Sequence, residues 1–120
     1  MRGAVRVLNV TRGTEVGSQV FFASTWWGRA RGWLGYPEPP PGTGLLLVPC
    51  KGIHMIGMKY PIDVAFLNLS NVVVATYASL QPWQRTKLHG DAHSALELPS
   101  GTLQKTGTAV GDQLGWEATQ

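Results

Sequence analysis

The side chains best suited to chemistry are concentrated in one segment, residues 50–63. It contains Cys50, His54 and Met58, which recur every four residues and so share one face of a strand and nearly one face of a helix. Thiolate, imidazole and thioether ligands together would suit Cu(I). Because two glycines and a proline break any regular geometry within the segment, the sequence predicts neither a metal nor another cofactor.

Asp63 stands at the start of an otherwise apolar run. A carboxylate in such a row has to find hydrogen-bond donors or shift its pKa. The sequence favours a structural Asp63 that accepts backbone amides or pairs with an Arg or His, and a functional carboxylate is the alternative. Because side chains alternate along a strand, Ile62, Val64 and Phe66 are expected on one face. Asp63, Ala65 and Leu67 are expected on the other face.

Nucleophilic catalysis by a thiol is a second interpretation of the same segment. His54 would lower the pKa of the Cys50 thiol, and Asp63 would orient the imidazole. Nothing around Cys50 resembles a nucleophile elbow or a cysteine-protease signature, and a small cysteine often packs like an apolar residue. The sequence therefore favours a protein that is not an enzyme, with a thiol-dependent or metal-assisted enzyme as the alternative.

Two residues outside this segment could also contact a ligand. Arg31 follows a tryptophan-rich stretch and could hold an anion in a bidentate manner, although a solvated helix face would also explain it. Trp83 follows a proline in a loop and could stack on sugars, bases or peptide planes, although core packing would explain it equally well. His89 and His93 are expected to be surface histidines in a polar loop.

Composition limits the class of protein. The chain has 120 residues, of which 43% are hydrophobic and 14% charged, so we expect a single globular domain spanning residues 1–120 and no disorder. Its one cysteine cannot form an internal disulfide and fits a reducing compartment. No apolar run is long enough for export or for spanning a membrane. These features predict a cytoplasmic protein with no membrane partner.

The net charge of +3 does not indicate nucleic-acid binding. Ten Lys and Arg residues outnumber seven Asp and Glu residues, but the basic residues are scattered along the chain. Binding a phosphate backbone needs a patch that displaces several counterions together. We therefore expect no nucleic-acid partner and a monomer or weak homo-oligomer.

Short strands are the main expected element. Fifteen Gly and eight Pro are spread so that few uninterrupted segments exceed ten residues. Residues 44–49 form a continuous apolar run, typical of a strand buried on both faces. Ser70 and Asn71 predict a tight hairpin turn between two further strands. The expected strands are 5–10, 16–23, 44–49, 61–69, 72–77, 95–98 and a last one that ends at Trp116.

Two short helices are expected beside these strands. Residues 24–35 carry tryptophans at helical spacing, with Ser24 or Thr25 as the N-cap. Ser100 is expected to cap a second helix that ends at Gly107. The predicted fold class is α+β, a mostly antiparallel sheet with two short helices.

Several motifs occur in an order that carries a family resemblance. They are Arg29-x-Arg31-Gly32-x-Leu34-Gly35, His54-x3-Met58-x2-Pro61-Ile62-Asp63-Val64-x-Phe66-Leu67, Pro82-Trp83, Leu96-Glu97-Leu98-Pro99-x-Gly101 and Gly111-Asp112-x-Leu114. Together they resemble the bacterial and archaeal family of domain of unknown function 192. The resemblance runs from about Val5 to Leu114, nearly the whole chain.

This resemblance implies a compact, barrel-like β fold with small helices, and it implies no reaction because the family's activity is not established. The sequence departs from the family at Ser70-Asn71, where an Asp/Gly-type turn is common, and at Ile56-Gly57, where many members carry an aromatic residue. A ligand that needs this aromatic wall would be bound differently. The positions that the family pattern emphasises are Arg31, His54, Met58, Asp63, Pro82 and Trp83.

The leading expectation is a small-ligand binding module with a polar pocket. A carbohydrate or a small anion is the expected ligand class. Arg31, His54 and Asp63 are expected to meet in one hollow. A protein-interaction module built on the proline-rich residues 36–43 remains an alternative, as does the enzyme. The expected ligand-binding residues are Arg31, His54, Met58, Asp63 and Trp83.

Overall fold

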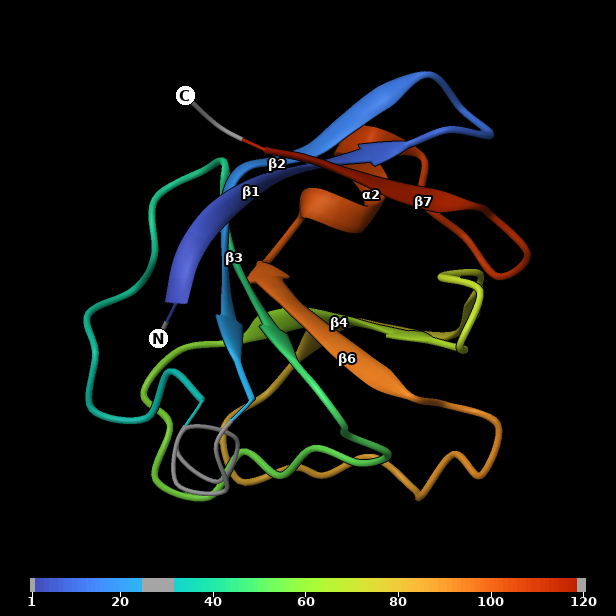
Figure 1. The fold of residues 1–120 in the computed structure, drawn as a ribbon. Helices are drawn as coiled ribbons and strands as arrows, with labels where there is room; N and C mark the ends of the chain where they lie inside the picture. The colour runs from blue at the N-terminus through green and yellow to red at the C-terminus, as the bar shows by residue number, and fades with distance from the viewer. Residues whose placement is uncertain (1, 25–31, 119–120) are drawn as a thin grey trace.

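A computed structural model describes residues 2–24 and 32–118, which form a seven-stranded sheet and one short α-helix (Figure 1). Every strand expected from the sequence is present, with bounds that differ by a few residues. The elements are β1 (Arg2–Asn9), β2 (Thr14–Ala23), β3 (Thr43–Leu47), β4 (Ile62–Leu67), β5 (Val73–Leu80), β6 (Ser94–Pro99), α2 (Thr102–Thr106) and β7 (Leu114–Ala118).

The sheet is mostly antiparallel, as predicted. Its strand order is β5-β4-β6-β3-β2-β1-β7, and among its neighbouring pairs β2 and β3 run parallel. The barrel-like closure is not confirmed, because β5 and β7 are the two edges of the sheet. Within the described residues these edges meet around one isolated bridge, between Val72 and Gln113, rather than along a ladder.

The predicted hairpin connects β4 to β5. Asn71 adopts a φ of 61°, the left-handed conformation that the tight turn requires. The turn is also held by Asn68, whose Oδ1 accepts the backbone amides of Ser70 (2.9 Å) and Val72 (3.0 Å).

The helices differ from the sequence-based prediction. Helix α2 is present and ends at Gly107 as predicted. Its N-cap residue is Gly101, which has no side chain to cap the helix, so the prediction that Ser100 is the N-cap is wrong. Of the other expected helix, residues 25–31 lie outside the described residues, and residues 32–35 form turns. No helix in the described part of the chain has both the length and the apolar character needed to cross a membrane.

Each face of the sheet buries its own apolar cluster. Leu45 and Leu47 of β3 belong to one cluster and Leu46 to the other. The prediction that β3 is buried on both faces is therefore confirmed, and all six residues of β4 are buried as well. Side chains on these central strands are therefore largely removed from bulk water on both faces.

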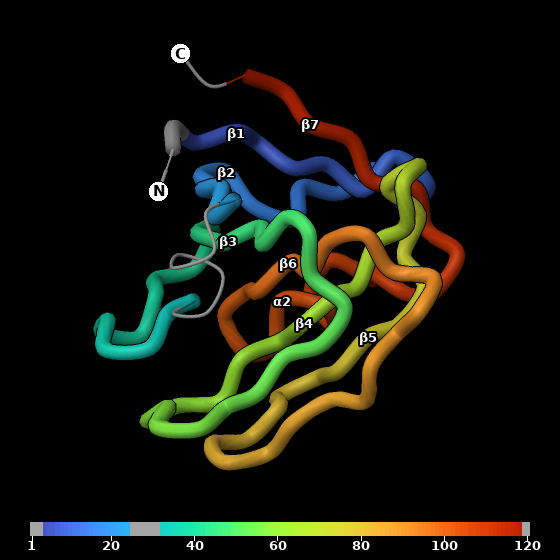
Figure 2. Tube along the Cα trace, turned by 60° about the horizontal axis from the view of Figure 1, so that its bottom comes forward, coloured from blue at the N-terminus to red at the C-terminus, as the bar shows by residue number. Residues whose placement is uncertain are grey.

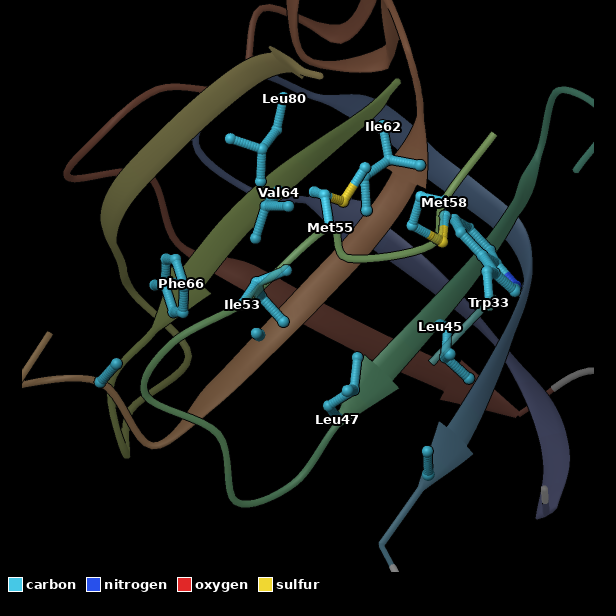
Figure 3. Close-up of a cluster of buried hydrophobic side chains, with 13 residues drawn as sticks. Trp33, Leu45, Leu47, Ile53, Met55, Met58, Ile62, Val64, Phe66 and Leu80 are labelled. Atoms are coloured by element: carbon cyan, nitrogen blue, oxygen red, sulfur yellow. The ribbon is translucent and has the colours of Figure 1, made fainter. Parts of the chain in front are cut away.

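Two loops cover one of these faces. Residues 50–58 and 83–93 run side by side in Figure 2 and exchange backbone hydrogen bonds. The amide of Met55 donates to Gln84 O (2.8 Å) and that of Thr86 donates to Ile53 O (2.9 Å). This loop pair encloses the apolar cluster shown in Figure 3 between itself and the sheet.

Candidate functional site

A cavity of about 50 Å³ lies between the loop pair and the sheet. A buried water-sized site needs roughly 10–15 Å³ on this measure, so the cavity has room for a group of a few non-hydrogen atoms. The described residues that line it are Gly32, Trp33, Leu34, Gly52, Ile53, His54, Met55, Ile56, Met58, Ile62 and Glu97. We call it the Glu97 cavity.

Glu97 is the polar group at the sheet side of this cavity. The residue is 5% exposed, and none of the described residues forms a hydrogen bond with its Oε1. Burial raises the pKa of Glu97 from 4.5 to about 8, because desolvation penalises the charged carboxylate. Buried polar atoms are almost always hydrogen-bonded in folded proteins. An unsatisfied carboxyl oxygen in a cavity is therefore the strongest sign of a binding site in this structure.

The pairing of β6 with β4 explains the direction of this side chain. Glu97 lies opposite Val64 in the ladder, and Leu98 lies opposite Asp63. Because directly opposite residues share a face, Glu97 lies on the same side as Val64, which packs in the cluster under the loops. Asp63 and Leu98 lie on the other side. Sequence analysis missed Glu97 because it took the alternation in residues 95–98 for an ordinary strand.

The backbone at Gly32 runs close against the Glu97 carboxyl group. Gly32 is buried, has a φ of +52°, and a Cβ atom built on it would lie 3.1 Å from Glu97 Oε1. Nearby, the Tyr60 hydroxyl shares its one proton between the carbonyl oxygens of Tyr36 (3.2 Å) and Pro37 (3.3 Å). This contact ties residues 36–37 to the segment that leads into β4. Burial, and then the negative charge of Glu97, raise the pKa of Tyr60.

Gly32→Ala tests this close approach. We expect it to cost about 1–2 kcal/mol of unfolding free energy for the left-handed backbone and a further ~1 kcal/mol for the contact with the carboxyl group. Gly13→Ala is the matched control, because Gly13 has a φ of +71° and nothing within 4 Å of the added Cβ. Urea unfolding of both variants checks this, and equal losses would show that Glu97 does not press on the backbone at Gly32.

One tight turn supplies two thioethers to the cavity. The Met58 amide donates to Met55 O (3.2 Å), and both side chains are buried. Figure 3 shows them on the same side of the cluster as Trp33. Met58 was predicted as a site residue and does line the cavity. Met55 and Trp33 were not singled out for this role.

His54 connects the cavity to the surface. His54 is exposed and its backbone forms an isolated β-bridge with Arg85. It lines both the Glu97 cavity and a shallow groove of about 590 Å³ outside the cavity. The groove is also lined by Thr86 and Lys87. We call this the basic groove, because its ionisable side chains are His54, Arg85 and Lys87. Positive potential in a concave surface attracts anions.

The structure does not bring Asp63 to His54. The Asp63 carboxylate accepts three backbone amides: Oδ1 that of Ser79 (2.8 Å), and Oδ2 those of Gly101 (3.1 Å) and Leu103 (2.8 Å). Gly101 is the N-cap residue of α2 and Leu103 is its second residue, so Asp63 supplies the side-chain acceptor that was expected from Ser100. The prediction that Asp63 meets His54 in one hollow is therefore wrong, because the Asp63 carboxylate lies on the opposite face of the sheet from the cavity. Its three hydrogen bonds agree with the favoured prediction of a structural Asp63 that accepts backbone amides.

Two other sequence-based expectations can be compared with the structure. Cys50 is half-buried, and its thiol donates to Gly52 O (3.2 Å). His89, expected on the surface, is buried. Its ring packs against Phe66 (ring centroids 4.6 Å apart, planes tilted by 40°) and its Nε2 lies 2.7 Å from the Tyr77 hydroxyl, so these two aromatic side chains shield it from water.

The remaining predicted site residues stay predictions. Trp83 is 70% exposed, and its amide donates to Met55 O (2.9 Å), but its side chain is not among the described groups that line the cavity. Arg31 lies outside the described residues, directly before Gly32.

The model of domain of unknown function 192 (DUF192), described as an uncharacterized ACR, matches residues 7–116. The chain belongs to the DUF192 family. The UPF0127 protein PF1050 of Pyrococcus furiosus is 34% identical over 116 residues, covering 92% of this chain and 97% of that protein. The resemblance inferred from the motifs is confirmed, and the match includes both Glu97 and the loop pair.

Two solved structures share the DUF192 fold seen here. A protein of unknown function from Novosphingobium aromaticivorans has a TM-score of 0.80 at 21% identity, covering 94% of this chain and 84% of that chain. A candidate transcription regulator from Sinorhizobium meliloti has a TM-score of 0.79 at 20% identity, covering 95% and 92%. At these identities the likeness establishes the fold alone.

Proposed function

We propose that the protein is a small-ligand binding module whose site is the Glu97 cavity together with the basic groove. The observation that carries this proposal is the buried Oε1 of Glu97, which faces a cavity and has no hydrogen-bond partner among the described residues. Leaving such a group unsatisfied costs about 1–3 kcal/mol, and more if it is charged. A ligand that supplies the missing partner would remove this cost on binding.

A small molecule with an anionic group fits the basic groove better than a carbohydrate does. Arg85 and Lys87 can pair with a carboxylate or phosphate at the mouth of the cavity, and His54 adds a third polar group. A sugar needs several convergent hydrogen-bonding groups, whereas the described side chains that line the cavity offer few: the Glu97 carboxyl, the His54 imidazole and the Trp33 indole N–H. Arg31 and Trp83 are proposed as further contacts, because Arg31 adjoins Gly32 and Trp83 lies on the loop that pairs with Met55.

We further propose that the protein is a cytoplasmic single domain that acts as a monomer or weak homo-oligomer. Its support is the sequence, in which one cysteine and a scattered charge pattern point away from export and from nucleic acid. The Cys50 thiol donates to the backbone carbonyl oxygen of Gly52, as a structural cysteine does, so we place the binding module ahead of thiol catalysis.

A titration followed at the cavity methionines tests the proposal. Protein labelled with ¹³C at the methionine methyl groups would be titrated with small carboxylates, phosphates, amino acids and monosaccharides. We expect a compound that carries both an anionic group and a hydrogen-bond donor, such as an amino acid, to shift the Met55 and Met58 signals, and Glu97→Gln to weaken its binding about tenfold or more.

Glu15→Gln is the control, because Glu15 is an exposed carboxylate that pairs with Arg6. It is expected to leave the affinity unchanged. The proposal fails if no compound moves the Met55 and Met58 signals, or if Glu97→Gln binds as tightly as the parent protein.

A further inference from the structure

We infer that the Glu97 cavity receives a cationic nitrogen of the ligand, an ammonium group, with Glu97 as its counter-ion. This inference rests on the proposed function and specifies its ligand. Combined with the basic groove, it describes a small zwitterion whose positive end is innermost and whose negative end lies against Arg85 and Lys87.

The chemistry of the cavity wall favours a cation. Its interior presents electron-rich groups: the carboxyl of Glu97, the thioethers of Met55 and Met58, and the indole of Trp33. An ammonium group interacts favourably with the face of an indole ring and with polarisable sulfur. Among the described lining residues, His54 at the mouth is the only one that can carry positive charge. An anion would meet a carboxyl group and few donors inside, so its place is the groove.

The size of the cavity also limits the group that enters. A volume of about 50 Å³ accommodates an ammonium or methylammonium head but not a ring. The carboxyl lies at the sheet side, whereas the groove shares Gly52, Ile53 and His54 with the cavity. A ligand can therefore extend from the Glu97 carboxyl, past His54, into the basic groove.

Binding of a cation should be coupled to loss of a proton. Without a ligand, burial keeps the Glu97 carboxyl protonated up to a pH near its pKa of about 8. When the ammonium group binds, the Glu97 proton passes to the buffer and the carboxylate pairs with the cation. Among the described residues, the titratable groups near Glu97 are the Tyr60 hydroxyl and the His54 imidazole, and Glu38 also acts on Tyr60.

Methylammonium, acetamide and acetate, followed at the Met55 and Met58 methyl signals, distinguish the possible ligand classes. We expect methylammonium to bind with an affinity that rises about tenfold per pH unit up to about pH 8 and then levels off. Calorimetry in buffers of different ionisation enthalpy should show about one proton released per ligand. Glu97→Gln should abolish both effects, and His54→Gln should change the affinity but keep the pH slope.

Three outcomes would overturn the inference. If acetamide binds at least as well as methylammonium with no pH dependence, the ligand group is neutral and only the proposed function stands. If none of the three compounds moves the signals, the cavity takes no cation. If Arg31→Gln gains methylammonium binding that the parent protein lacks, an internal guanidinium already pairs with Glu97.

Discussion

Asp63→Ala is expected to lower the free energy of unfolding by about 3–5 kcal/mol. Its carboxylate is fully buried and accepts three backbone amides, one from Ser79 and two at the start of α2. A hydrogen bond to a charged group contributes about 1.5–3 kcal/mol, and each donor left without a partner in the interior adds a desolvation cost. Partial hydration of the vacated site would keep the total below the simple sum.

Urea unfolding with linear extrapolation measures this loss. Asp63→Asn should cost less, because it preserves the shape and one acceptor oxygen but removes the charge. Asp91→Asn, at an exposed carboxylate, is the control and should stay within about 0.5 kcal/mol of the parent. If Asp63→Ala were nearly as stable as the parent but lost ligand binding at the Glu97 cavity, Asp63 would belong to the site and its structural role would be wrong.

Glu97→Gln is expected to make the protein more stable, by an amount that grows with pH. The folded-state pKa of Glu97 is raised to about 8 from its ordinary 4.5. Between these two values the folded protein holds a proton that the unfolded chain has released. Its stability therefore falls as pH rises, by about 1.4 kcal/mol per pH unit. Glutamine does not titrate, so the gain should be near zero below about pH 4.5 and roughly 3 kcal/mol at pH 7.

The quantity to measure is the difference in unfolding free energy between Glu97→Gln and the parent, from pH 4 to pH 9. Taking the difference cancels other titrating groups, such as Asp112, whose pKa is lowered first by a hydrogen bond from Asn9 and then by Arg12. Asp112 favours folding above its ordinary pKa, and this contribution is lost as the pH falls. A difference that stays flat from pH 5 to pH 8 would mean that Glu97 is ionised and paired in the folded protein.

A group that destabilises the folded protein at neutral pH needs a reason to be there. Perturbed carboxyl groups in cavities are typical of functional sites, where a local cost in stability is exchanged for binding. Glu97 fits this pattern, because its carboxyl oxygen is unsatisfied, faces the Met55 and Met58 side chains, and is reached from the basic groove.

The sequence by itself determined the strands and part of the site. Alternation, turn residues and apolar runs predicted all seven strands and the Asn71 hairpin, and the continuous apolar run in residues 44–49 predicted the burial of β3 on both faces. Chemical reasoning also predicted that Asp63 must find donors, and it placed His54 and Met58 in the segment that lines the cavity. These features depend on local backbone preference and on the period of two along a strand.

Only the tertiary structure decided which carboxylate faces the cavity. Alternation tells which residues of a strand share a face, but not which face the loops will cover or that the opposite face is buried as well. The register of β6 on β4 sets Glu97 beside Val64 under the loops and Asp63 on the other side, against α2. That register depends on pairing between residues more than thirty positions apart, so no local pattern in the sequence could specify it.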